Sequence, residues 1–159
     1  MEGTLSVTAP DFTFRSTSSM TVPLGGILTV EAAIPRGGAP TVNVDGGLAT
    51  INNLQMNAGD NAMTVFANSG NFRLGRLQNF DVVNDSMVIN LLPGAEVTRL
   101  GFSNLSFAEF EDLISYDSVN YTLDFASGSD RTYSLTAVPE PSIALLGSLG
   151  VLGLLRRRR

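Results

Sequence analysis

Cysteine, histidine and tryptophan are absent from this chain of 159 residues, and all ten of its basic residues are arginine. Without cysteine there are no disulfides and there is no thiolate chemistry. Without histidine the chain has neither Ser-His-Asp nor Cys-His catalysis, and no imidazole metal ligands. Carboxylates are the acid–base groups that remain, so the composition predicts a protein that is not an enzyme.

Charge is unevenly distributed along the chain. Residues 1–138 hold six arginines and fourteen carboxylates, a net charge of −8, whereas the whole chain carries −5 because four arginines stand at its C-terminus. A body this acidic is repelled by phosphate backbones. We therefore expect no nucleic-acid partner.

Alternation of apolar and polar residues dominates residues 1–136. Val119 to Phe125 and Leu28 to Ile34 follow a two-residue period, and Met87 to Leu92 is almost continuously apolar. Glycine-rich turns such as Gly25-Gly26 and Pro93-Gly94 separate such runs at a spacing of about ten residues. The pattern predicts an all-β, jelly-roll-like β-sandwich over residues 1–136; no convincing internal repeat is apparent, which leaves a solenoid as the minor alternative.

One segment has a helical pattern. Ser106 and Glu109 have the spacing of a capping box, and Phe110, Leu113 and Ile114 then fall on one helical face. A short helix that covers an open end of the sandwich is expected here.

No carboxylates stand out as catalytic. Glu109, Glu111 and Asp112 cluster near the expected helix start, where negative charge favours the helix dipole. Asp45 and Asp60 in glycine-rich loops could offer oxygen ligands to Ca²⁺, but the spacing of a calcium loop is missing and Asx residues favour turns in their own right. We expect no cofactor, with Ca²⁺ as the less favoured alternative.

The C-terminal 23 residues form a separate unit. Pro139 and Pro141 predict an extended spacer over residues 137–142. Residues 143–155 carry no charge, and such a run tolerates hydrocarbon only as a helix, here about 20 Å long against a bilayer core of about 30 Å. Residues 143–159 are therefore predicted to form a single transmembrane helix with a basic stop, with the body outside and the C-terminus in the cytoplasm.

This order of spacer, apolar run and basic end resembles the PEP-CTERM sorting signal of exported bacterial proteins, over residues 137–159 only. The sorting motif would comprise Val138, Pro139, Glu140 and Pro141. The transmembrane helix would comprise Ile143, Ala144, Leu145, Leu146, Gly147, Ser148, Leu149, Gly150, Val151, Leu152, Gly153, Leu154 and Leu155, and the basic stop Arg156, Arg157, Arg158 and Arg159. The resemblance implies a membrane-anchored precursor and an exosortase, a transpeptidase-like membrane enzyme that recognises and cleaves such tails. Proteins with this tail normally begin with a secretory signal, and residues after Met1 show neither a basic start nor an apolar run. We therefore expect either that sequence upstream of Met1 encodes the signal or that the chain is a remnant that is not exported.

The resemblance also implies a function class: a non-catalytic protein of the cell surface, extracellular matrix or biofilm, with exopolysaccharide as an expected partner. The alternative is a secreted carbohydrate-active enzyme or carbohydrate-binding module that uses surface carboxylates. A third possibility is a β-solenoid binder with a flat Thr/Asn face, of which the sequence shows little sign.

Overall fold

The structure is a computed structural model and describes residues 4–7, 12–15, 17–36, 38–56, 61–81 and 84–139. No helix within these ranges is long and apolar enough to cross a membrane. The predicted transmembrane helix and basic stop, with Glu140 and Pro141, lie outside the described residues.

The described chain is mostly β-structure, with one short helix, as the sequence predicts. Its elements are β1 (Thr4–Val7), β2 (Phe12–Arg15), β3 (Ser19–Pro23), β4 (Ile27–Val30), β5 (Ala33–Arg36), β6 (Thr41–Gln55), β7 (Ala62–Gln78), β8 (Ser86–Leu91), β9 (Ala95–Arg99), α1 (Phe107–Glu111), β10 (Ile114–Ser115), β11 (Tyr121–Ala126) and β12 (Arg131–Ala137).

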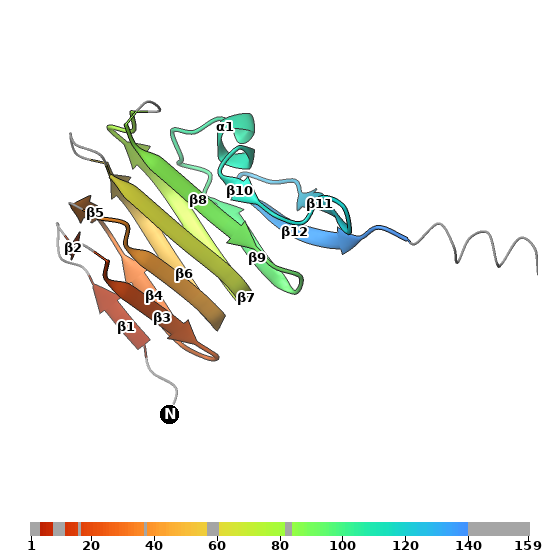
Figure 1. Ribbon diagram of the computed structural model, residues 1–159, viewed down its shortest axis with the longest axis horizontal. Coiled ribbons are helices and arrows are strands. Elements are labelled where there is room, and N and C mark those ends of the chain that lie inside the picture. Colours follow the sequence, from red (N-terminus) through yellow and green to blue (C-terminus); the bar gives the residue numbers. More distant parts are fainter. Residues whose placement is uncertain are drawn as a thin grey trace, which may run out of the picture.

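The strands form a β-solenoid-like stack of coils (Figure 1). The pairs that link the strands from β1 to β10 are all parallel among the described residues. Ser19 pairs with Thr41, Thr41 with Thr64, and Thr64 with Val88, so equivalent positions are 22, 23 and 24 residues apart. The long strands β6 and β7 have 15 and 17 residues, so each runs through most of a coil. The first part of β6 pairs with β3 and its later part with β4, and the first part of β7 pairs with β8 and its later part with β9.

The predicted β-sandwich is not confirmed. A two-residue period with frequent turns is common to sandwiches and solenoids, because in both folds each strand buries one face. What differs is the pairing partner, which is here the strand one coil away, in parallel, where a sandwich would pair strands antiparallel. The coils do repeat, although no repeat was expected from the sequence: glycines at one corner, Gly25, Gly46, Gly70 and Gly94, have φ angles of 73°, 94°, 82° and 87°.

Inward-pointing side chains stack from coil to coil to make the core. Leu28, Ala49, Phe72 and Val97 occupy successive register positions and are at most 2% exposed. Full burial of a Leu, Val or Phe side chain stabilises a fold by about 1.5–3 kcal/mol, so the contacts between neighbouring coils contribute to the stability of each one.

A C-terminal cap, which consists of α1, β11 and β12, closes the last coil. β12 pairs antiparallel with β9, which sets Tyr133 beside Val97 as the next member of this core row. The Tyr133 ring stacks on Phe110 of α1, with 5.6 Å between ring centroids. The helix start predicted from the capping box is confirmed: Glu109 N donates to Ser106 Oγ at 3.2 Å and Ser106 N to Glu109 Oε2 at 2.7 Å. The helix is shorter than predicted, because it ends at Glu111, and Ile114, expected on its apolar face, lies instead in β10 and pairs with Ile89 of β8.

Arginine and aromatic rings hold this cap together. The Cζ atom of Arg131 lies 3.4 Å from the ring centroid of Phe107 and 4.3 Å from that of Phe125. Arg99 approaches the same Phe107 ring at 4.5 Å and donates from Nε to the carbonyl of Leu105 at 2.8 Å. These contacts tie α1 to both β9 and β12.

Candidate functional site

One side of the coils presents a surface that we call the β3–β8 face. It consists of the outward residues of β3, β6, β7 and β8 and of the positions that follow these strands: Ser19, Thr21, Pro23, Thr41, Asn43, Asp45, Thr64, Phe66, Asn68, Val88, Asn90 and Leu92. They alternate with buried residues such as Val42, Val65 and Ile89, which places them on the solvent side of the sheet.

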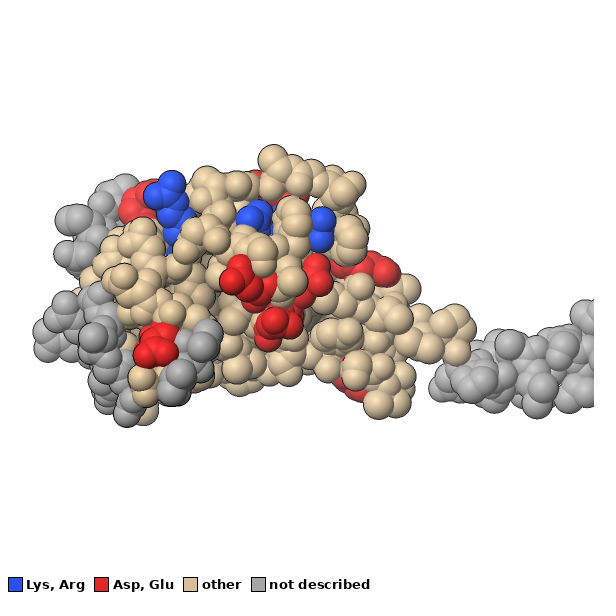
Figure 2. All heavy atoms as spheres, turned by 90° about the horizontal axis from the view of Figure 1, so that it is seen from above, with Lys and Arg blue, Asp and Glu red and all other residues tan. Residues whose placement is uncertain are grey.

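The β3–β8 face has almost no charge. Its single ionisable group is Asp45, which accepts a hydrogen bond from Asn68 Nδ2 at 2.7 Å. On another side of the molecule, acidic side chains are spread over several places (Figure 2). Hydroxyl, amide and apolar groups therefore make up a largely neutral surface on an acidic protein.

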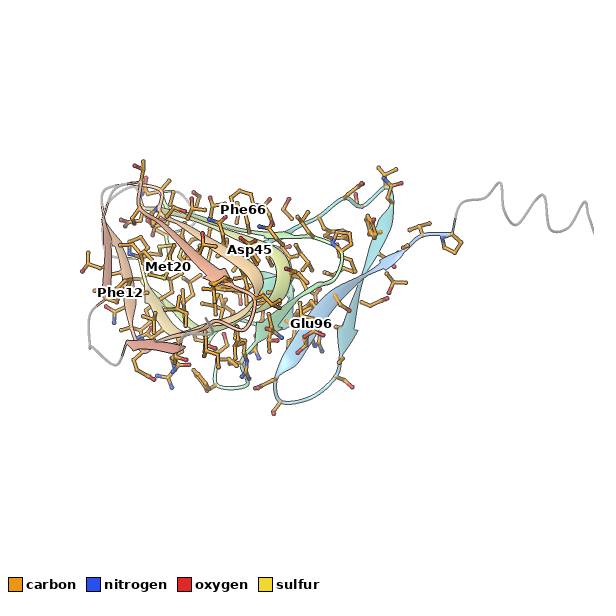
Figure 3. All side chains as sticks on the ribbon, turned by 90° about the horizontal axis from the view of Figure 1, so that it is seen from below. Phe12, Met20, Asp45, Phe66 and Glu96 are labelled. Carbon is orange, nitrogen blue, oxygen red and sulfur yellow. The ribbon has the colours of Figure 1, made fainter. Side chains whose placement is uncertain are left out.

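Phe66 lies in the middle of this face. It is 37% exposed, and its register partners are Asn43 in the preceding coil and Asn90 in the following coil. Val88 and Leu92 on β8 and just beyond it are also exposed, at 39% and 47%. Figure 3 shows Phe66 and Asp45 toward one side of the coils and Glu96 toward the other.

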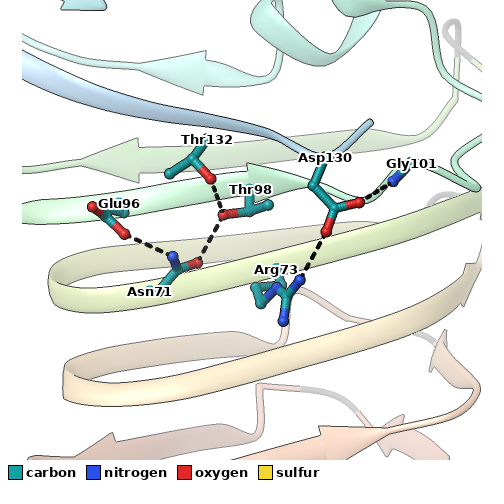
Figure 4. Close-up of polar contacts among 7 residues, drawn as sticks. All are labelled: Asn71, Arg73, Glu96, Thr98, Gly101, Asp130 and Thr132. Atoms are coloured by element: carbon teal, nitrogen blue, oxygen red, sulfur yellow. Dashed lines mark hydrogen bonds and ion pairs between the residues drawn. The ribbon is translucent and has the colours of Figure 1, made fainter. Parts of the chain in front are cut away.

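The side formed by β4, β9 and their partners carries a hydrogen-bonded network that continues into the cap (Figure 4). Asn71 Nδ2 donates to Glu96 Oε2 at 2.9 Å, and Thr98 Oγ1 donates to Asn71 Oδ1 at 3.1 Å. The hydroxyl oxygens of Thr98 and Thr132 lie 3.0 Å apart, across the junction between coils and cap. This network links successive strands, which is a structural role.

A second set of contacts joins the cap to the coils on the same side. Arg73 Nη2 lies 3.0 Å from Asp130 Oδ2, and the other oxygen of Asp130 accepts the Gly101 N–H at 2.6 Å. The Asp130 carboxylate thus holds β7 and the loop after β9 against the turn before β12.

The glycine corner forms a shallow groove of about 460 Å³. Its lining consists of Gly25, Gly26, Ile27, Gly46, Gly47, Leu48, Gly70, Asn71, Gly94 and Glu96. The groove exists because the coils touch through their backbones there: a Cβ atom on Gly47 would lie 2.5 Å from the carbonyl oxygen of Pro23. A stripe of glycines with such a steric explanation does not identify a ligand.

The three acidic residues that cluster in the sequence, Glu109, Glu111 and Asp112, have different surroundings in the structure. Glu109 completes the capping box, and hydrogen bonds with the side chain and backbone N–H of Ser106 hold its pKa below the usual value. Glu111 Oε1 accepts the Tyr133 hydroxyl at 3.1 Å and lies 3.5 Å from Arg131 Nη1. Asp112 is exposed at the end of α1.

Two further titratable groups have shifted pKa values. Hydrogen bonds from the Asn120 amide and the Val119 N–H lower the pKa of Asp117. Burial, and then the hydrogen bond to Glu111, raises the pKa of Tyr133. A general acid in a glycosidase needs a raised carboxyl pKa, which is the opposite of the shifts at Glu109 and Asp117.

Of the two aspartates weighed as Ca²⁺ ligands, the structure describes only Asp45. Asp45 lies in β6 and is bonded to Asn68, while Asp60 falls outside the described residues. Within the described ranges, no three acidic side chains lie close enough to hold a metal ion.

The sorting motif follows the cap directly. Val138 comes immediately after β12, is 41% exposed, and donates its N–H to the carbonyl of Asn120 at 2.9 Å. Pro139 is the last described residue, so the tail leaves the body from the final strand of the cap.

No curated protein and no solved structure matches this chain. The model of one family does match it, over residues 137–159, and that family is the PEP-CTERM protein-sorting motif. The match agrees with the resemblance stated from the sequence and covers the same residues. Residues 137–159 therefore mark this chain as an exported protein with a C-terminal PEP-CTERM sorting signal.

Proposed function

We propose that this protein is a non-catalytic component of the cell surface or extracellular matrix, whose solenoid body binds a neutral exopolysaccharide. The observation that carries the proposal is the β3–β8 face, which is nearly free of charge although residues 1–138 have a net charge of −8. The hydroxyls, amides and few apolar groups of this face can bind a neutral sugar polymer, which presents hydroxyls and apolar C–H faces.

The tail accounts for the location. PEP-CTERM motifs are recognised by exosortase, which fits a processing enzyme as partner. In the proposed sequence of events, residues 143–155 insert as a helix with the four arginines in the cytoplasm, and exosortase then cuts near Pro139. Because β12 leads straight into the motif, the body sits close to the membrane until the cut is made.

A non-catalytic role is supported by the use of the carboxylates. Glu109 caps α1, Glu111 holds Tyr133 and Arg131, and Asp130 joins the cap to the coils. The rival function, a secreted carbohydrate-active enzyme, would have to use exposed groups such as Asp45 and Glu96.

A binding assay on a polysaccharide panel separates the two functions. The full chain, kept in a detergent without a sugar headgroup, is passed over immobilised neutral and acidic polysaccharides with and without Ca²⁺. We expect saturable binding to a neutral polymer, unchanged by Ca²⁺ and without release of reducing sugar. Release of reducing sugar that Asp45→Asn or Glu96→Gln abolishes would overturn the non-catalytic function.

A further inference from the structure

We infer that Phe66, between Asn43 and Asn90, is the sugar-contact point of the β3–β8 face: one ring of a neutral polysaccharide stacks on Phe66 while the two amides bond its hydroxyls. This inference rests on the proposed function and names the residues that would perform it.

The register of the coils brings the three side chains together. Phe66 pairs with Asn43 on one side and with Asn90 on the other, and neighbouring strands lie about 4.8 Å apart. The same row continues to Thr21 in β3 and to Ser115 in β10. It spans four strand spacings, about 19 Å, and has polar groups on both sides of a single aromatic ring.

Exposure shows that Phe66 is not a core residue. Its neighbours in β7, Val65 and Ala67, are fully buried, whereas 37% of Phe66 is accessible. Packing in the core therefore does not explain why an aromatic residue occupies position 66. By contrast, the partly exposed Phe125 ring packs on Arg131 and Tyr133 within the cap.

The chemistry of the row matches a pyranose ring. Such a ring has apolar C–H faces and a rim of hydroxyls, and an aromatic face carries partial negative charge that attracts C–H groups. Each Asn offers two N–H donors and a carbonyl acceptor, so it can bond hydroxyls that donate or accept. One of these amides, that of Asn43, also donates to Ser19 Oγ at 3.1 Å, which holds it on the face.

Charge selects a neutral polymer. No arginine stands on this face, and Asp45 with the acidic body would repel carboxylated or sulfated chains. A membrane surface would favour basic residues around a larger apolar area. Val88 and Leu92 extend the apolar contact beside Phe66 and leave the face mixed in character.

The test compares Phe66→Ala with Phe102→Ala, which removes another exposed ring, 52% accessible, at the end of the coils. Affinity of the full chain is measured for the neutral polysaccharide that binds best, in the same detergent. We expect Phe66→Ala to weaken binding about tenfold or more, Asn90→Ala about threefold, and Phe102→Ala less than twofold. Phe66→Trp should retain or strengthen binding, and urea denaturation of each variant verifies that the fold is intact.

The outcomes are distinguishable. If the unaltered chain binds a polysaccharide and Phe66→Ala binds equally well, this inference is wrong and the proposed function stands. Failure of the unaltered chain to bind any polysaccharide overturns both. Sedimentation of the unaltered chain as a dimer that Phe66→Ala dissociates would make this face an interface between copies and would also overturn the inference.

Discussion

The backbone of Gly70 lies so close to that of Gly47 in the preceding coil that a Cβ atom on Gly70 would overlap the Gly47 carbonyl oxygen. Gly70 also has a φ of 82°, which side chains other than glycine rarely adopt. Backbone contact at this corner thus sets how closely successive coils stack.

Gly70→Ala is expected to destabilise the protein by about 2–4 kcal/mol, because the steric overlap adds to the strain of a positive φ. Gly94→Ala is the matched control: Gly94 has a φ of 87°, but nothing lies within 4 Å of its Cβ position. It should cost only about 1–2 kcal/mol, the strain alone. Urea denaturation of both variants checks this, and equal losses would contradict the role given to the Gly47 contact.

Arg131→Lys should destabilise the cap although the charge is kept. The guanidinium lies between the rings of Phe107 and Phe125, and an ammonium cannot stack on both. We expect a loss of about 1–2 kcal/mol. Arg73→Lys, at a partly exposed ion pair with Asp130, should cost less than about 1 kcal/mol. A larger loss from Arg73→Lys in the same denaturation assay would refute the argument.

Stability should fall in alkali because of Tyr133. Burial raises the pKa of the Tyr133 hydroxyl in the folded state above its ordinary value of 10. As the pH rises past 10, the hydroxyl therefore loses its proton in the unfolded chain before it does so in the folded chain, which favours unfolding. The stabilisation is complete below pH 10 and is lost as the pH rises through the raised value. Denaturation midpoints between pH 8 and pH 11 should show a steeper decline for the unaltered chain than for Tyr133→Phe. If the midpoints of the two proteins decline equally with pH, the loss of stability in alkali comes from groups other than Tyr133.

The tail predicts a mass change on export. Protein recovered from the surface of its native cell should end near the Pro139-Glu140-Pro141 motif, because exosortase is expected to cut there. Intact mass spectrometry measures this directly. Surface-exposed chains that still end in Arg159 would contradict the predicted cleavage and would leave membrane anchoring as the function of the tail.

Local structure was predictable from the sequence wherever it depends on neighbouring residues. The alternation along Val119 to Phe125 predicted β-structure that the structure contains in β11, and Ser106 with Glu109 predicted the start of α1. The partners of the strands were not predicted, because a period of two residues specifies which face is buried and leaves the pairing open. An alignment on the glycines at positions 25, 46, 70 and 94 would have given the coil length.

The candidate site was missed for the same reason. Asn43, Phe66 and Asn90 are far apart in the sequence and form a row only after the register of β6, β7 and β8 is known. The tail needs no such knowledge, since its spacer, apolar run and arginines are consecutive, and the family match covers those same residues.

Because the body is a stack of similar coils closed by a separate cap, its length can change by whole coils without changes to the other contacts. One more unit of about 23 residues, inserted between β6 and β7, would find the same backbone and core contacts on both sides that existing coils make. It would lengthen the molecule by about 4.8 Å and add one step to each outward row, while β12 kept its pairing with β9. Duplication of a single coil is therefore a simple route by which such a protein gains reach and binding length together.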